Sequence, residues 1–161
     1  MPTVAYLGLG ANLGDPIQQL LDARQALMVL TASGPLRCSS FYASSPVGYD
    51  AQPDFINCVV ELETNKSALE LLDDMQAIEN SLGRQRIISN QNAPRSIDID
   101  LLLYGEQTIT HKRLQVPHPR MKDRLFVLQP LLELTQLEVY RSALMVGDFE
   151  GQCITKLRVG G

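Results

Sequence analysis

Cysteine is scarce in this sequence, which contains only Cys38, Cys58 and Cys153. An odd number of widely spaced cysteines without a C-x-x-C pair argues against a disulfide framework and favours reduced thiols. No Cys or His cluster has zinc-ligand spacing, and no Ser or Cys lies in a hydrolase nucleophile elbow. The P-loop pattern G-x-x-x-x-G-K-[ST] is also absent, so a bound nucleotide would have to be held by side chains outside such a loop.

Long apolar runs are missing as well. No run approaches the roughly 18 residues of a membrane-spanning helix, and residues 1–7 lack the basic segment and cleavage pattern of a signal peptide. We therefore expect a soluble, cytoplasmic protein. A length of 161 residues with 45% apolar residues is sufficient for one domain with its own core. We predict a single domain over residues 1–161.

The sequence has no excess of positive charge. Its 14 Lys and Arg residues stand against 18 Asp and Glu residues, a formal net charge of -4, which argues against general binding to nucleic acid or membranes. The basic residues are nevertheless concentrated, because eight of the fourteen lie within residues 84–124, together with both histidines. This basic sector indicates either an anionic ligand or a solvated basic face, and charge alone does not choose between them.

Four strands are predicted from short runs rich in β-forming residues, at residues 3–9, 36–42, 55–64 and 96–104. The long loop at residues 44–53 is a candidate functional loop. Additional C-terminal elements are a short strand near Thr108 and a helix over about residues 121–134.

Two helices are predicted between these strands. The first begins at Asp15 and Pro16, and its apolar residues recur at helical spacing to about Leu30. The second begins at the Ser67 capping box and ends at Gly83, before a flexible polar loop over residues 84–95. The element order predicts an α+β fold, a ferredoxin-like β-α-β-β-α-β core with an additional C-terminal strand and helix.

Asp98 and Asp100 are the clearest candidates for chemistry. They are two residues apart on a predicted strand, so both carboxylates point to one face while Ile97 and Ile99 face the core. Such a pair suits Mg²⁺, which prefers one or two carboxylates with phosphate and water. An exposed face of an amphipathic strand is the alternative, but the surrounding arginines of the basic sector favour a metal and phosphate site.

Two other patterns are weaker. Gln76 and Glu79 lie at i and i+3 on the second predicted helix, where they could bind a sugar or base or simply be solvent-exposed. The glycines at positions 8, 10 and 14 follow a strand as in a dinucleotide-binding fingerprint, but the third is one residue late and no acid ends the next strand. We reject the dinucleotide interpretation.

Several motifs in register resemble those of the 6-hydroxymethyl-7,8-dihydropterin pyrophosphokinase (HPPK) family of folate synthesis. The similarity runs from about residue 4 to residue 134 and is carried by Ser39-Ser40-Phe41-Tyr42, Pro46-Val47-Gly48, Gln52-Pro53-Asp54-Phe55-Ile56-Asn57, Gly83-Arg84-Gln85-Arg86, Pro94-Arg95-Ser96-Ile97-Asp98-Ile99-Asp100 and Val116-Pro117-His118. Several separated motifs in order are more specific than any single one.

The resemblance implies an enzyme that transfers the β,γ-diphosphate of ATP to the pterin hydroxymethyl group, with two Mg²⁺ ions at Asp98 and Asp100. It implies catalytic roles for Arg86, Arg95, Asp98 and Asp100. The nucleotide-binding positions it implies are Gln76, Glu79, Arg86, Arg95, Leu101, Arg113, His118 and Arg124. The pterin-binding positions it implies are Ser44, Val47, Phe55, Asn57 and Phe126, and it places Arg84 on a mobile loop.

Departures from the family pattern leave an alternative open. The sequence has no tryptophan, and residues 90–95 replace the family's usual Arg-Trp-Gly-Pro-Arg, one residue longer as counted from Arg86. The alternative is a weakly active or non-catalytic paralogue that binds pterin or nucleotide. An RNA-recognition domain is disfavoured because no Gly-Phe-x-Phe run appears. We expect a monomer whose partners are ATP and the pterin, with neither nucleic acid nor membrane.

Overall fold

The structure is a computed structural model that describes residues 2–32, 34–44, 54–89 and 97–158, with the backbone alone for residues 84–89. The strands are β1 Thr3–Ala11, β2 Arg37–Cys38, β3 Tyr42–Ser44, β4 Phe55–Thr64, β5 Ile97–Tyr104, β6 Ile109–His111, β7 Leu114–Val116 and β8 Ile154–Lys156. The helices are α1 Pro16–Leu27, α2 Ala68–Ser89, α3 Leu125–Leu134 and α4 Glu138–Val146, with short 3₁₀ turns η1 Met28–Leu30 and η2 Met121–Asp123. None of the helices in these described ranges has the length and apolar character needed to cross a membrane.

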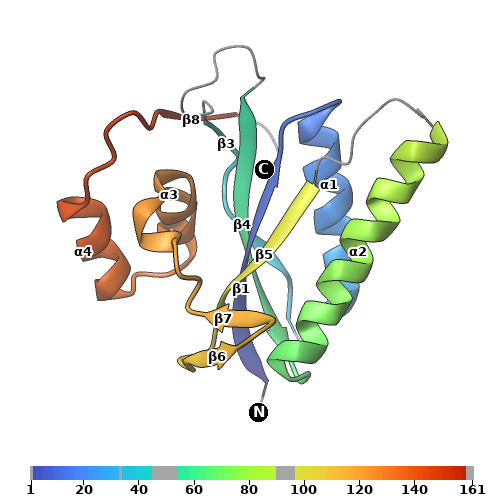
Figure 1. Cartoon of the computed structure of the whole chain (residues 1–161), viewed down its shortest axis with the longest axis horizontal. Helices are drawn as coiled ribbons and strands as arrows, with labels where there is room; N and C mark the ends of the chain where they lie inside the picture. Colours follow the sequence, from blue (N-terminus) through green and yellow to red (C-terminus); the bar gives the residue numbers. More distant parts are fainter. Residues whose placement is uncertain (1, 33, 45–53, 90–96, 159–161) are drawn as a thin grey trace.

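The main sheet has the strand order β5-β1-β4-β3-β8, and β2 also pairs with β4. All pairs are antiparallel. This order confirms the predicted ferredoxin-like core, in which the first strand lies between the third and the fourth. Figure 1 shows α1 and α2 on one side of the sheet and α3 and α4 on the other, with the β6–β7 hairpin near one end.

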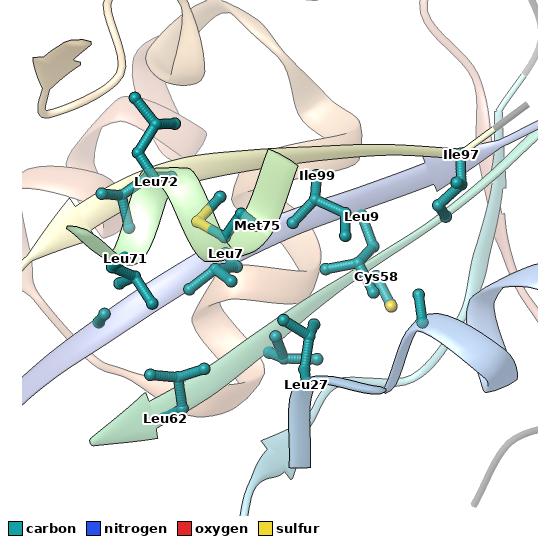
Figure 2. Packing of buried hydrophobic residues seen from close by; sticks show 14 of the residues in the cluster. Leu7, Leu9, Leu27, Cys58, Leu62, Leu71, Leu72, Met75, Ile97 and Ile99 are labelled. Atoms are coloured by element: carbon teal, nitrogen blue, oxygen red, sulfur yellow. The ribbon is translucent and has the colours of Figure 1, made fainter. Parts of the chain in front are cut away.

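The main core lies between the sheet and helices α1 and α2. Alternate residues of β1, β4 and β5 face these helices, and Leu7 is completely buried there. Figure 2 shows Leu71 and Met75 of α2 pointing toward β1, and Leu27 of α1 belongs to the same cluster. The period-two pattern of the strands meets the helical stripe of α2, as the sequence predicts.

Helices α3 and α4 close part of the opposite face of the sheet. Val59, Leu102, Leu128 and Tyr140 form a second, smaller cluster there. At the C-terminal end of α3, Glu133 accepts hydrogen bonds from the Tyr42 hydroxyl and, at 2.8 Å, from the Ser40 amide. These bonds fix that end of α3 to the first residue of β3 and to the segment just before it.

The predicted helix starts are confirmed. The Asp15 side chain accepts a hydrogen bond from the Gln18 amide at 3.2 Å, and Pro16 occupies the first turn of α1. Ser67 and Glu70 exchange the two bonds of a capping box, at 3.0 and 3.2 Å.

The predicted strand over residues 36–42 is divided in two. Cys38 pairs with Val60 and Tyr42 pairs with Asn57, so four steps on this side match three steps on β4. One extra residue therefore has to be accommodated between β2 and β3, as in a β-bulge. The Ser39 hydroxyl accepts a hydrogen bond from the Val59 amide there, at 2.9 Å.

The predicted end of the second helix at Gly83 is wrong, because α2 continues to Ser89. The described glycines with positive φ are Gly14, Gly34, Gly105 and Gly151, so Gly83 does not adopt the left-handed conformation that ends many helices. The residues that follow Gly83, Arg84, Gln85 and Arg86, are good helix formers. The backbone at Arg84 is thus helical and not part of a loop.

Candidate active site

A row of small and polar residues crosses the sheet on the face opposite the main core. Gly10 of β1 lies between Asp98 of β5 and Asn57 of β4, and Gly8 lies between Asp100 and Val59. A Cβ atom at position 10 would be 2.9 Å from Asn57 Oδ1, a contact too close to keep without a shift. The two glycines therefore leave room on the central strand beside the carboxylates.

This row forms part of a cavity of about 620 Å³. We call it the larger cavity, and its lining includes Gly8, Gly10, Ser44, Phe55, Asn57, Asp98, Asp100, Arg120, Arg124, Phe126, Gln152 and Cys153. The Asn57 side-chain amide donates to Ser44 Oγ at 2.8 Å, and both residues are buried. A cavity with two half-buried phenylalanines and a fixed amide suits a flat heterocycle with polar edges.

A second cavity, of about 490 Å³, lies on the other side of Asp100. We call it the smaller cavity, and its lining includes Gln76, Glu79, Asp100, Leu101, His111, Lys112, Arg113 and His118. The Arg113 guanidinium donates to Asp73 at 2.6 Å and to Gln76 at 3.4 Å. Lys112 and Arg113 make this cavity suitable for an anionic ligand.

Glu79 and Leu101 both line the smaller cavity, one with a hydrogen-bonded carboxylate and the other mainly with its backbone. One Glu79 carboxylate oxygen accepts a hydrogen bond from the Ile99 amide at 2.6 Å, which ties α2 to β5. The Leu101 side chain is 3% exposed and belongs to the main core. Leu101 therefore offers the cavity mainly its backbone.

Asp100 lines both cavities and has a perturbed acidity. Partial burial between the cavity walls raises the pKa of its carboxyl above the ordinary value, and the charge of Asp98 acts in the same direction. His118 and Arg124 act in the opposite direction without cancelling the effect. A bound cation would stabilise the ionised form that desolvation disfavours, so Asp100 is suited to be a metal ligand.

His118 lines the smaller cavity and interacts electrostatically with Asp100. Burial lowers its pKa below the ordinary value, and Arg124 and Arg120 add to this effect, while Asp100 opposes it. The His118 Nδ1 atom accepts a hydrogen bond from the Arg120 amide at 3.2 Å, which fixes the orientation of the ring. Because Nδ1 is the acceptor in this bond, a neutral His118 carries its proton on Nε2, which remains available as a donor.

The donor set fits the metal that the resemblance implies. Asp98 and Asp100 present carboxylate oxygens on one open face, and across the described part of the chain no group of three or more His, Cys, Asp or Glu residues gathers as a metal site. Mg²⁺ in phosphate-transferring sites is commonly bound by one or two carboxylates, with substrate phosphates and water completing the shell. Two carboxylates beside a cavity lined by Lys112 and Arg113 meet that requirement.

Most of the predicted site residues come together, and one lies in an unexpected position. Arg124, expected at the nucleotide, lines the larger cavity, with its guanidinium 5.6 Å from the centre of the Phe126 ring. Val47, Arg95 and the side chains of Arg84 and Arg86 lie outside the described residues.

The sequence did not identify several cavity residues. Gly8 and Gly10 belonged to the rejected dinucleotide fingerprint, and they lie within β1, where their small size matters more than any turn. Gln152 and Cys153 reach the larger cavity because β8 pairs with β3, a long-range contact with no local signal. Arg120 was visible only as one member of the basic sector.

Together, the fold and the two cavities that meet at a carboxylate define an enzyme of the phosphate- or diphosphate-transferring class. Comparison with known proteins specifies the family. The profile of the family described as 7,8-dihydro-6-hydroxymethylpterin-pyrophosphokinase (HPPK) matches residues 6–136, and the chain belongs to this family.

Relatives in bacteria carry the same enzyme name. The 2-amino-4-hydroxy-6-hydroxymethyldihydropteridine pyrophosphokinase of Haemophilus influenzae is 44% identical over 130 residues, which are 81% of this chain and 80% of the relative. The enzyme of that name from Bacillus subtilis is 40% identical over 160 residues, which are 99% of this chain and 95% of the relative.

Solved structures support the fold. A Plasmodium falciparum HPPK-DHPS triple mutant with pteroate has a TM-score of 0.65 at 14% identity, and the match covers 94% of this chain and 46% of that one. An HPPK-DHPS crystallised with substrates has a TM-score of 0.61 at 15% identity, covering 89% and 43%. This chain thus spans less than half the length of these two structures.

Proposed function

We propose that this chain transfers the diphosphate of ATP to 6-hydroxymethyl-7,8-dihydropterin, giving AMP and the pterin diphosphate, in folate biosynthesis. The observation that carries the proposal is the position of Asp100, which lines both cavities. An acceptor in the larger cavity and a nucleotide in the smaller one would bring their reacting groups together at this carboxylate. Family membership supports the same reaction.

The pterin occupies the larger cavity in this proposal. Phe55 and Phe126 contact its faces, and the fixed Asn57 amide, held by Ser44, offers hydrogen bonds to its polar edge. The backbone at Val47 is a further contact that the family resemblance suggests.

The nucleotide occupies the smaller cavity. Gln76, Glu79, Arg113 and His118 surround it, and the backbone at Leu101 is available to the base or sugar. Arg86 and Arg95 are proposed to neutralise the phosphates, on the strength of the family resemblance. Little covalent help is needed for phosphate transfer, so the chain contributes mainly alignment and charge neutralisation.

Asp98 and Asp100 are the proposed ligands of two Mg²⁺ ions. When bound, Mg²⁺ supplies neutralisation of the phosphate charge and a template for the transfer. Arg124 lies on the larger-cavity side of Asp100, where it can stabilise negative charge that develops between donor and acceptor. We also propose that the protein is a monomer located in the cytoplasm.

An assay of AMP release from ATP and hydroxymethyl-dihydropterin tests the proposal directly. It is paired with calorimetric pterin binding in the presence of a non-hydrolysable ATP analogue. Pterin-dependent AMP formation supports the enzyme. Tight pterin binding with little AMP favours the weakly active or non-catalytic paralogue, and the absence of both binding and turnover contradicts the proposed function.

A further inference from the structure

The Gln152 side chain contacts the junction between η2 and α3, although Gln152 itself lies 27 residues after this junction in the sequence. Its Oε1 atom accepts a hydrogen bond from the Leu125 amide at 2.9 Å, and its Nε2 atom donates to the Asp123 carbonyl at 2.9 Å. The residue between these two contacts is Arg124. One carboxamide therefore holds the backbone on both sides of Arg124, and Gln152 itself lines the larger cavity.

This contact supplies what the start of α3 lacks locally. The first amides of a helix have no partner within the helix and are usually satisfied by the side chain of the N-cap residue. Arg124 is the N-cap residue of α3 and makes no side-chain cap hydrogen bond. Gln152 provides an acceptor for the first helical amide from a segment 27 residues later. A carboxamide accepts at its oxygen and donates at its nitrogen, whereas an ionised carboxylate of the same length can only accept.

The clamped turn carries two side chains of the proposed site. Arg124 acts electrostatically on both Asp100 and His118, and its guanidinium lies 5.6 Å from the centre of the Phe126 ring. A change in the backbone at residues 123–125 would move the charge and the ring together. Displacements of about 1 Å in such groups can cost up to about a hundredfold in rate.

We propose that Gln152 is a positioning residue, which holds the 123–125 turn so that Arg124 and Phe126 face the larger cavity. The inference rests on the proposed function, since it assigns Gln152 an effect on the same reaction. Gln152 acts through Arg124 and Phe126 and need not touch the reacting atoms.

The first test compares steady-state AMP formation by the full chain and by three variants. Gln152→Ala removes both bonds and is expected to lower kcat/KM for the pterin about tenfold. Gln152→Glu keeps an acceptor for the Leu125 amide but loses the donor to the Asp123 carbonyl, and we expect an intermediate loss. Gln136→Ala is the matched control, because the exposed Gln136 side chain donates to the Leu132 carbonyl at 2.7 Å and lies outside the lining of both cavities. It should keep wild-type kinetics.

A double-mutant cycle separates positioning from general stability. All assays are run well below the melting temperature of each variant, measured separately. If Gln152 acts through Arg124, then Gln152→Ala should lower kcat/KM about tenfold in the wild type but only about twofold in the Arg124→Ala background, because the group to be positioned is gone.

The outcomes are distinguishable. An equal loss in both backgrounds, or wild-type kinetics in Gln152→Ala while Arg124→Ala is impaired, overturns the positioning role alone. Full activity in Arg124→Ala overturns the site assignment and the positioning role with it. Absence of turnover in the wild type overturns the proposed function and, with it, any effect of Gln152 on the reaction.

Discussion

The two faces of the sheet differ in the size and polarity of the side chains that they carry on the central strand. The face toward α1 and α2 is filled by large apolar side chains, with Leu7 and Met75 completely buried. The opposite face has glycines at positions 8 and 10 where the first face has leucines at 7 and 9. The same strands therefore supply a dense core on one side and, on the other, a cavity floor beside two carboxylates. Local alternation creates this division, since successive residues of a strand point to opposite faces.

The largest expected effect is on the cavity face. Asp98→Ala or Asp100→Ala should lower turnover about 10³-fold, roughly 4 kcal/mol, by removing a ligand for the phosphate-neutralising cation. Stability should change little, because removing one of two neighbouring carboxylates relieves repulsion. The measurement is AMP formation at saturating Mg²⁺, together with thermal melting. Glu106→Ala, outside both cavities, serves as the control, and full activity in both aspartate variants contradicts the metal assignment.

The core face should respond in the opposite way. Leu7→Ala removes a fully buried side chain and is expected to lower the free energy of unfolding by about 3 kcal/mol. Urea denaturation measures this loss. At a temperature where the variant is still folded, its kcat should remain close to that of the wild type. A loss of kcat as large as that in the aspartate variants would show that the two faces are not separable.

Gly10→Ala sharpens the comparison at one position on the central strand. The added Cβ would lie 2.9 Å from Asn57 Oδ1, so the Asn57 amide has to move from its place beside Ser44. We expect KM for the pterin to rise about tenfold, roughly 1.4 kcal/mol, with a smaller change for ATP. Gly34→Ala is not a suitable control, because Gly34 has a φ of 72° and a side chain there is strained. The exposed Ala77→Ser on α2, outside both cavities, serves instead. Equal KM changes for both substrates would contradict the assignment of Asn57 to the pterin.

Much of this comparison could be predicted from the sequence, for a physical reason. The carboxylates at Asp98 and Asp100 and the core positions at Ile97 and Ile99 follow from period-two alternation, which is a local property. The capping box at Ser67 is equally local. Gly83 does not end α2 because a glycine permits the left-handed turn that ends many helices without enforcing it, and the composition does not report the backbone angle.

The residues that were missed depend on contacts distant in sequence. Gln152 acts on Leu125 across 27 positions, and β8 joins the sheet by pairing with β3, from Tyr42 with Lys156 to Ser44 with Ile154. The sequence predicted nothing beyond residue 134, where α4 and β8 lie. Gly8 and Gly10 carried a visible pattern, but their role as a cavity floor requires knowing which residues lie beside them on β4 and β5.

The smallest expected effect concerns the attachment of α3 to the cavity face. Burial raises the pKa of Glu133, but the hydrogen bonds from Tyr42 and Ser40 outweigh it, and the folded-state pKa lies below the ordinary value of 4.5. A group whose pKa is lowered by folding contributes stability above the unfolded-state pKa and loses it as pH falls through the folded-state value. Because Glu133 is only partly desolvated and its side chain is still exposed to solvent, we expect it to contribute only about 1 kcal/mol to the free energy of unfolding. Urea denaturation of the wild type and Glu133→Gln at pH 7 and pH 3.5 measures it. The wild type should be the more stable at pH 7, and the gap should shrink at pH 3.5, whereas a gap independent of pH would show that the carboxylate charge does not hold α3 in place.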